Sequence, residues 1–198
     1  MNTTQRRAAT VACALSLALA VAGCSDGTEA QGQTAESSTT SQASTPTPTA
    51  STAMSDAMFA AMMIPHHQTG IEMTQMALQK AATPGVREVA QAAQTSQQEQ
   101  LPLLEEVAAT GDMKPMPPEE PIQRFNEQEM AELMALEGEA FDRKWLDVFS
   151  SHHMSAIMMA DVALASDGSP AAQQLEQEIH DGQLGQLEQM NTLRDQLG

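Results

Sequence analysis

The sequence predicts an all-α fold, a four-helix bundle made of two repeated helical hairpins, within residues 54–198. Two observations predict it. From Met54 onward Ala, Met, Leu, Gln and Glu dominate, which are good helix formers, and the alternating apolar runs and tyrosines of strands are missing. The same stretch also contains an internal repeat, offset by 86 residues from His66 to His152, that needs no gaps. Since a single hairpin cannot bury its apolar face, the two copies are expected to pack on each other.

The first 53 residues are expected to lie outside this domain. An apolar stretch from Ala8 to Ala20 follows two arginines, is too short to span a membrane, and is typical of a secretory signal. The small residues before Cys24 favour a lipoprotein signal over residues 1–23 with lipid on Cys24, and an ordinary signal peptide is the alternative. Residues 24–53, rich in Ser, Thr, Gln and Pro, predict a disordered tether. The protein is thus expected to be exported and anchored to the outer face of the cell membrane.

The first repeat, about 55–108, predicts two helices. Ser55 is expected to cap a helix that ends near residue 81. Thr83-Pro84 is expected to cap and start the next helix, because proline is tolerated at the first helical position. Pro65 should bend the first helix, and Pro102 should kink or shorten the second.

A crossover and a second repeat follow. Residues 110–125 contain four prolines and predict an irregular connection. A short helix is expected to begin at Asn126 and to end near Gly138. The second repeat, about 139–197, then predicts helices over about 139–166 and 170–196.

Charge and cysteine content exclude several functions. The formal net charge of −17 argues against nucleic acid as a partner and against adhesion to anionic headgroups. The acidity serves solubility, or else it raises the local concentration of cations. If Cys13 is removed with the signal and Cys24 carries lipid, the mature chain has no thiol for a disulfide or a metal.

Four of the five histidines form two pairs at equivalent repeat positions, His66-His67 and His152-His153. Methionines lie at helical spacing around both pairs. Imidazole binds copper, zinc, nickel and iron, whereas thioether sulfur selects Cu(I) and related soft ions. A His/Met set without cysteine therefore favours Cu(I) or Ag(I) over Zn(II). The alternative is structural, because methionine commonly fills irregular cores and a lone histidine such as His180 is usually structural or on the surface.

The two copies are not identical, and enzyme signatures are missing. Val148, Phe149 and Ser150-Ser151 stand where the first copy has two methionines and Ile64-Pro65. No histidine has Glu three positions before it, as a di-iron carboxylate bundle requires, and the sequence contains no Gly-rich phosphate loop or nucleophile elbow. The sequence therefore predicts that the protein is not an enzyme.

At these residues the chain resembles the bacterial family catalogued as domain of unknown function 305. The resemblance covers about 54–197 and lies in the run from Met62 to Met73, in Gly138 to Ala160, and in the repeated Gln-x-x-Gln-Leu segments that begin at Gln97 and Gln183. It implies a ferritin-like four-helix bundle that is exported and often lipid-anchored, with some members linked to copper binding and tolerance. It also implies that the candidate ligands are His66, His67, His152 and His153, followed by Met62, Met63, Met73, Met76, Met158 and Met159.

Two hypotheses follow. The first is a lipid-anchored, non-catalytic protein that binds a copper ion, Cu(I) being favoured with Ag(I) and Zn(II) possible, for sequestration or buffering. The second is a structural or interaction module without metal, whose partner is another envelope protein.

Overall fold

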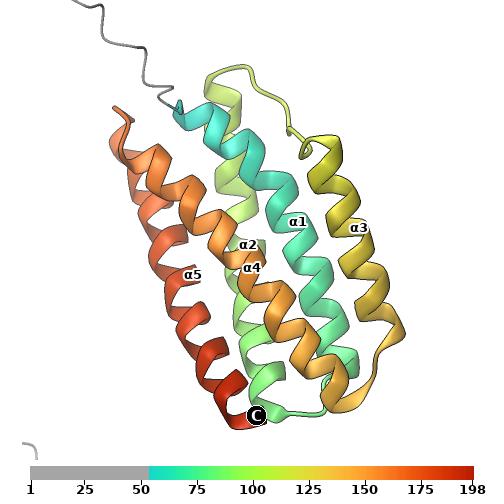
Figure 1. Cartoon of the computed structure of the whole chain (residues 1–198). Coiled ribbons are helices and arrows are strands. Elements are labelled where there is room, and N and C mark those ends of the chain that lie inside the picture. Colours follow the sequence, from blue (N-terminus) through green and yellow to red (C-terminus); the bar gives the residue numbers. More distant parts are fainter. Residues whose placement is uncertain (1–53) are drawn as a thin grey trace, which may run out of the picture. The chain divides into compact units, whose positions relative to one another are not determined.

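The computed structural model describes residues 54–198, so the predicted signal peptide, the predicted lipidation at Cys24 and the predicted tether lie outside the described residues. Within this range the chain forms five helices and no strand, which confirms the all-α class (Figure 1). No helix in the described range is long and apolar enough to cross a bilayer. The helices are α1 (Asp56–Lys80), α2 (Pro84–Thr110), α3 (Glu120–Ala135), α4 (Gly138–Leu164) and α5 (Pro170–Leu197).

The helix starts follow the local chemistry of the sequence. The Ser55 hydroxyl accepts a hydrogen bond from the backbone N–H of Met58 at 3.2 Å, which confirms it as the cap of α1. Pro84 and Pro170 each occupy the first turn of their helix, as predicted. Gly138 begins α4 with a φ of +63°, a conformation that suits glycine.

The structure corrects the predicted start of the third helix. Helix α3 begins at Glu120 rather than Asn126, so the irregular crossover ends earlier than residue 125. The reason is Pro121, which lies in the first turn, where a missing N–H removes no helical bond. Helix α2 runs through Pro102 to Thr110, close to its predicted end near residue 108. Pro102 is exposed, so water can reach the backbone carbonyl that it leaves without a partner.

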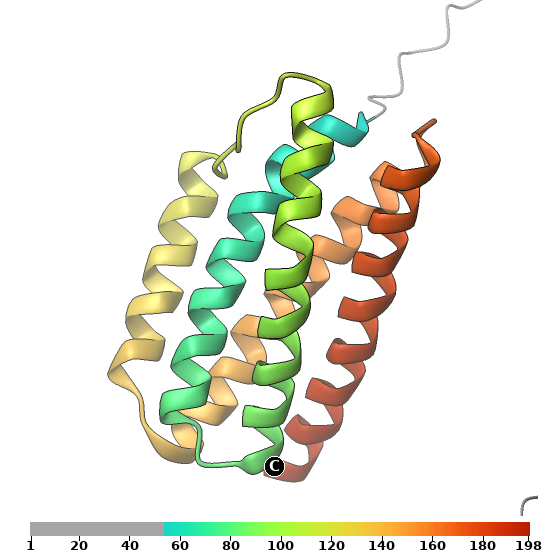
Figure 2. The same cartoon turned by 180° about the vertical axis from the view of Figure 1, so that it is seen from behind.

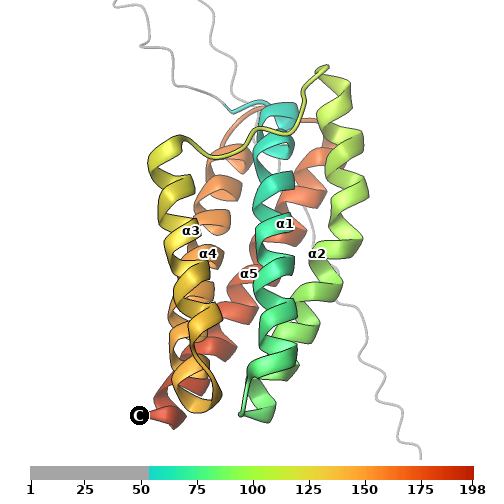
Figure 3. The same ribbon diagram turned by 90° about the vertical axis from the view of Figure 1, so that its right-hand side faces the viewer.

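The four long helices form the bundle. Helix α1 packs against α2 and α4, and α5 packs against α4 and α2, so each long helix touches two others. Helix α3 lies outside this ring, beside α1, in the two opposite views of Figures 1 and 2. It contacts α1 and α4. Figure 3 shows the same arrangement from the side. The predicted two-hairpin bundle is thus present, with one added helix.

Two apolar clusters fill the bundle, one toward each end. The first surrounds Phe59, Leu104 and Ile179, and the second surrounds Trp145 and Phe149. On α1 the first cluster extends to Ile64 and the second begins at Met73. The segment between them carries His66 and His67, and the other three long helices show the same interruption at their middles. A polar layer therefore separates the two apolar halves. Its residues are His66, His67, Gln97, Gln100, His152, His153, Gln183 and Gln186.

The two repeats also stabilise each other through reciprocal contacts. Asp142, at the start of α4, accepts hydrogen bonds from the N–H groups of Ala82 and Thr83 at 3.1 and 2.7 Å. Its counterpart Asp56 accepts one from the N–H of Ser169 at 2.8 Å. Each hairpin thus satisfies the backbone at the turn of the other, as expected from an internal duplication with a two-fold relation.

Candidate functional site

The polar layer brings the two histidine pairs together from α1 and α4. The His66 and His152 rings stack with their centroids 3.7 Å apart and their planes 16° from parallel. His67 lies 6.4 Å from His66, and His153 lies 6.2 Å from His152, between ring centroids. Adjacent residues point about 100° apart on a helix. The inner histidines, His66 and His152, therefore meet at the interface of α1 and α4. The outer histidines, His67 and His153, face α2 and α5.

Two glutamines fix the orientation of the outer histidines. His67 Nε2 lies 2.9 Å from Gln100 Oε1, and His153 Nε2 lies 2.7 Å from Gln186 Oε1. An amide oxygen only accepts, so each Nε2 carries the proton and donates it. In a neutral ring the Nδ1 atom is then unprotonated and holds a free lone pair.

Ser155 fixes His66 in the same way. The Ser155 hydroxyl donates to the backbone carbonyl of His152 at 2.8 Å, which uses its only proton. His66 Nε2, 2.8 Å from the same hydroxyl, must therefore be the donor in their contact. The Nδ1 atom of His66 is left as the acceptor.

The layer contains a concentration of buried polar atoms without hydrogen-bond partners among the described residues. Such atoms are rare in proteins and are usually explained by an ion, a ligand or water. Gln97 is almost fully buried, and so is its repeat counterpart Gln183. The unpartnered atoms are Nδ1 of His66, His67 and His153, Nε2 of His152, and both amide heteroatoms of Gln97 and Gln183.

Gly70 makes room for part of this layer. A Cβ atom at Gly70 would lie 2.4 Å from Gln97 Oε1 and 2.8 Å from His152 Nε2, which is closer than real contacts allow. The second repeat has Ala156 at this position. Because Gly70 has no side chain, the Gln97 amide oxygen and the His152 Nε2 atom can both lie close to the backbone of α1.

All four histidines are held neutral. Burial, reinforced by His67 and His153, lowers the pKa of His66 to about 3. Burial also lowers the pKa of His67 and of His153 to about 4, and it lowers that of His152 well below its usual value. Neutral imidazole is the form that binds metals, so at neutral pH the layer offers nitrogen lone pairs without prior loss of a proton.

The geometry limits how an ion could bind. Within residues 54–198, no group of three or more His, Cys, Asp or Glu side chains converges as a preformed metal site would. The unpartnered nitrogens belong to rings that are stacked or tilted rather than aimed at one point. Their chemistry fits a soft ion of low coordination number, which would require the rings to turn.

The candidate methionines lie apart from one another. Met63 and Met73 are buried in the two apolar clusters, and Met76 and Met159 pack against the edges of those clusters. Met62 is half-buried, whereas Met158 is 61% exposed on α4. The structure therefore brings the four histidines together and distributes the methionines over the cores and the surface.

The glutamines of the polar layer were not predicted as site residues. Gln97, Gln100, Gln183 and Gln186 recur at equivalent positions in both repeats, and this recurrence was the available signal. The fifth histidine, His180, lies outside the polar layer, between Asp161 at 3.3 Å and Asp181 at 2.8 Å. This position agrees with the structural or surface role expected for it.

Comparisons with known proteins give a family match for this chain. The model of the family described as a domain of unknown function (DUF305) matches residues 20–108 and 56–194. No protein of curated function matches the chain in sequence.

Three solved structures illustrate the similarity in fold. The chain is 26% identical to CopM in its Ag-bound form, with a TM-score of 0.61 over 73% of this chain and 97% of that one. CopM in its Cu(I)-bound form is 24% identical, with a TM-score of 0.62 over 72% and 96%. A DUF305 fragment from Deinococcus radiodurans is 25% identical, with a TM-score of 0.64 over 71% and 95%.

Proposed function

We propose that this chain, which belongs to the DUF305 family, binds a copper ion as Cu(I) through the histidines of the polar layer. The observation that carries the proposal is that His66, His67, His152 and His153 are neutral and that each has a buried ring nitrogen without a hydrogen-bond partner among the described residues. An unmade hydrogen bond of a buried polar atom destabilises a protein by about 1–3 kcal/mol, so a layer of such atoms needs an explanation. A bound ion would supply the missing partner.

The chemistry of the layer favours a soft monovalent ion. Its donors are imidazole nitrogens and amide groups, which bring no negative charge to offset a divalent ion. Cu(I) and Ag(I) accept neutral nitrogen and sulfur ligands at low coordination number, whereas structural Zn(II) is usually four-coordinate. CopM structures include Ag-bound, Cu(I)-bound and Cu(II)-bound forms, so the similarity supports copper and silver, and the preference for the monovalent ion rests on the donor chemistry.

The outer histidines are the best-prepared ligands. Metal-binding histidines usually donate their second ring N–H to an oxygen acceptor, which fixes the tautomer and raises the basicity of the ligating nitrogen. Gln100 and Gln186 are such acceptors for His67 and His153. We therefore assign Nδ1 as the ligating atom in both rings.

The proposed setting is the outer face of the cell membrane. The predicted signal over residues 1–23 would export the chain, and lipid on Cys24 would anchor the bundle through the predicted tether of residues 24–53. A non-catalytic protein in that position would sequester or buffer copper outside the cytoplasm.

A competition titration tests the proposal. The full chain is titrated with Cu(I) against a chromophoric chelator under reducing conditions. A variant with glutamine at all four layer histidines should bind at least about 100-fold more weakly, or about 2.8 kcal/mol. His180→Gln, which alters the histidine outside the layer, serves as the matched control and should bind like the wild type. Circular dichroism checks that both variants remain helical.

Equal affinity of the wild type and the four-histidine variant would refute the proposal. The alternative, an interaction module without metal, would then be favoured by an observation on α4. Met154, Met158 and Val162 are all exposed there, at 47%, 61% and 46%. Contiguous apolar surface of this kind can mark a protein-binding face.

A further inference from the structure

A shallow hollow of about 730 Å³ lies on the outer surface of α4 and α5. Its lining includes the exposed thioethers Met154 and Met158, which are four residues apart and so share one helix face. Its lining also includes Ser155, whose hydroxyl lies 2.8 Å from His66 Nε2. One residue therefore belongs both to the wall of the hollow and to the polar layer.

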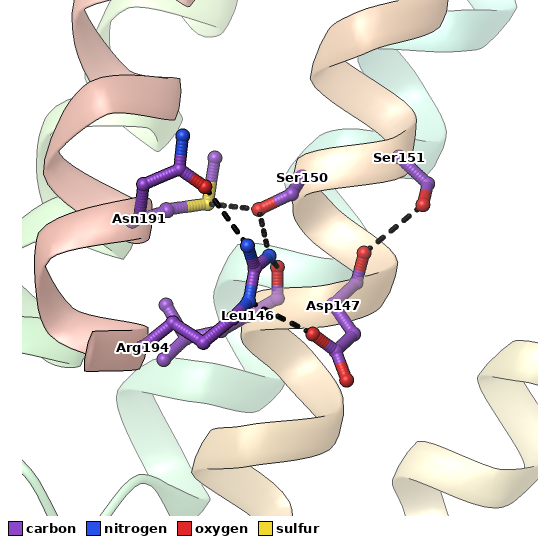
Figure 4. Close-up of polar contacts among 7 residues, drawn as sticks. Leu146, Asp147, Ser150, Ser151, Asn191 and Arg194 are labelled. Atoms are coloured by element: carbon purple, nitrogen blue, oxygen red, sulfur yellow. Dashed lines mark hydrogen bonds and ion pairs between the residues drawn. The ribbon is translucent and has the colours of Figure 1, made fainter. Parts of the chain in front are cut away.

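The polar groups at the other end of the hollow are already paired. Arg194 contacts the Leu146 carbonyl, the Ser150 hydroxyl and Asn191 Oδ1 at 3.2, 2.9 and 2.8 Å (Figure 4). The same guanidinium forms an ion pair with Asp147 at 2.9 Å. Because its charge is balanced, Arg194 makes no anion site, and the two thioethers are left as the donors available to a ligand.

The internal repeat shows that this hollow is particular to the second copy. The counterparts of Met154 and Met158 on α1 are Gln68 and Glu72, which are exposed polar residues of the ordinary kind. Methionine side chains gain nothing from exposure to water, since burying such a side chain is worth about 1.5–3 kcal/mol. The second copy thus differs from the first by two exposed thioethers, which are ligands for soft metal ions.

The crossover covers one end of the corresponding surface in the first copy, whereas Gln68 and Glu72 on that surface are exposed. The crossover after α2 lies on α1, where the Met116 N–H donates to the carbonyl of Ala61 at 2.7 Å, and Ala61 is fully buried. In the second copy the equivalent residue is Asp147, whose side chain is 66% exposed. The crossover thus covers the Ala61 end of this surface in the first copy, whereas the Asp147 end of the hollow stays exposed in the second.

We infer that this hollow is an outer capture site for a soft monovalent cation, held by the thioethers of Met154 and Met158, from which the ion reaches His66 past Ser155. The inference rests on the proposed function of the polar layer for the second step. Thioether ligands suit Cu(I) and Ag(I) and bind Zn(II) poorly. Two sulfurs on an exposed surface would hold the ion weakly enough to release it to the buried imidazoles.

Methyl NMR of the full chain, labelled with ¹³C at the methionine methyl groups, tests capture. Ag(I) is the probe, because it is diamagnetic and does not cycle between redox states. Ag(I) should shift the Met154 and Met158 methyl resonances in the wild type and in the variant with glutamine at all four layer histidines. The Met134 methyl, which is 61% exposed on α3, should not move. Unmoved Met154 and Met158 resonances would overturn the inference.

Loading kinetics test the route. The double substitution Met154→Leu/Met158→Leu keeps the apolar volume and removes only the soft ligands. In this variant Ag(I) should fill the polar layer about tenfold more slowly, with little change in its final affinity. Met134→Leu, an equally exposed methionine on α3, is the matched control and should load at the wild-type rate. Equal rates in both variants would reject the route.

The two failures are distinguishable. If the histidine ring resonances respond to Ag(I) and the two methyls do not, the capture site is wrong and the proposed function stands. If the methyls respond and the histidine rings do not, the polar layer is not a metal site, and transfer to His66 fails with it.

Discussion

The side-chain amides of Gln100 and Gln186 decide which nitrogen of each outer histidine is free. Without an oxygen acceptor at 2.9 Å, His67 could place its proton on either nitrogen and could turn its ring. The buried site would then lose both a defined tautomer and a satisfied N–H. The ligand and its acceptor are best regarded as one unit, which occurs twice in this molecule.

Gln100→Leu tests that unit. The change leaves the His67 N–H without an acceptor, and we expect it to lower the free energy of unfolding by about 1–3 kcal/mol. It should also lower Cu(I) affinity by about 10–100-fold, the usual effect of losing a partner of a metal ligand. Urea unfolding and the chelator titration measure the two effects. Gln98→Leu, an exposed position on the same helix, should change neither. Unchanged affinity in Gln100→Leu would contradict the assignment of Nδ1.

The pKa values predict how the metal-free protein responds to acid. The pKa of His67 and of His153 lies near 4 in the folded chain, because burial disfavours the charged ring, and near 6.5 when unfolded. Between these values the unfolded chain binds more protons, so stability is complete above about pH 6.5 and falls as the pH drops toward 4. Each histidine can contribute up to about 3 kcal/mol to this loss.

Urea unfolding at pH 7 and pH 5 measures the effect without metal. His153→Gln removes one titrating group, and its free energy of unfolding should therefore depend less steeply on pH. A wild-type stability that stays flat between these two pH values would show that the histidines are more accessible to water than the structure indicates.

Much of the site at the residue scale could be predicted from the sequence. The repeat and the helical period placed His66 and His152 on equivalent faces of two helices that must pack together. The positions of the methionines could not be predicted, because a thioether fits an apolar core as well as a metal site. Met63 and Met73 are core residues in the structure. The buried glutamines were equally hidden, since glutamine is common on exposed helix faces.

At the scale of the element, the four long helices were predicted within about two residues of their ends, which is the usual uncertainty of helix boundaries. The remaining error is the start of α3, which was predicted at Asn126 and lies at Glu120. A proline reads as a helix breaker in the sequence, but its effect depends on its position in the turn and on the side that faces water. Pro121 lies in the first turn of α3, and Pro102 lies on the exposed side of α2. The sequence alone shows neither the position of Pro121 in its turn nor the exposure of Pro102.

Gly70→Ala tests whether helix propensity or local packing decides the stability of α1. Alanine is intrinsically favoured over glycine in a helix by about 1 kcal/mol. At Gly70 its methyl group would collide with Gln97 and His152, and overpacking of this kind destabilises by about 1–3 kcal/mol. Because Gln97 is buried and has little space to move, we expect a net loss of stability, measured by urea unfolding.

Gly182→Ala in α5 is the matched control. A Cβ atom there meets no atom within 4 Å, so the substitution should stabilise the protein by about 0.5–1 kcal/mol. Two glycine-to-alanine changes in one bundle are thus predicted to have opposite signs. If Gly70→Ala were also stabilising, the close approach of Gln97 to α1 would not persist in solution.

At the scale of the whole molecule, the duplication explains why the site lies at the centre. Two hairpins related by a two-fold axis bring equivalent helices, here α1 and α4, into contact with each other. Any residue near the middle of that contact meets its own counterpart, as His66 meets His152. The sequence shows the duplication but not which residue pair lies on the axis. That requires the packing of the two apolar clusters, which fixes the register between the hairpins.

Asp142→Asn tests the reciprocal contacts that hold this register. The buried carboxylate accepts hydrogen bonds from Ala82 and Thr83 through its two oxygens, whereas asparagine has one oxygen and would turn an N–H₂ group toward one of the donors. We expect the free energy of unfolding to fall by about 1–3 kcal/mol. Asp56→Asn should have the smaller effect, because Asp56 accepts one backbone bond at a partly exposed site.

Urea unfolding followed by circular dichroism and by Trp145 fluorescence measures both variants. Trp145 is buried and donates its indole N–H to the Met73 carbonyl at 3.0 Å, so its emission reports on the contact between the repeats while circular dichroism reports on helix content. If the hairpins unfold only together, the two signals should share one midpoint in both variants. A fluorescence change that precedes the loss of helix in Asp142→Asn would show instead that the hairpins separate before they unfold. The polar layer would then depend on Asp142 for its alignment as well as for its stability.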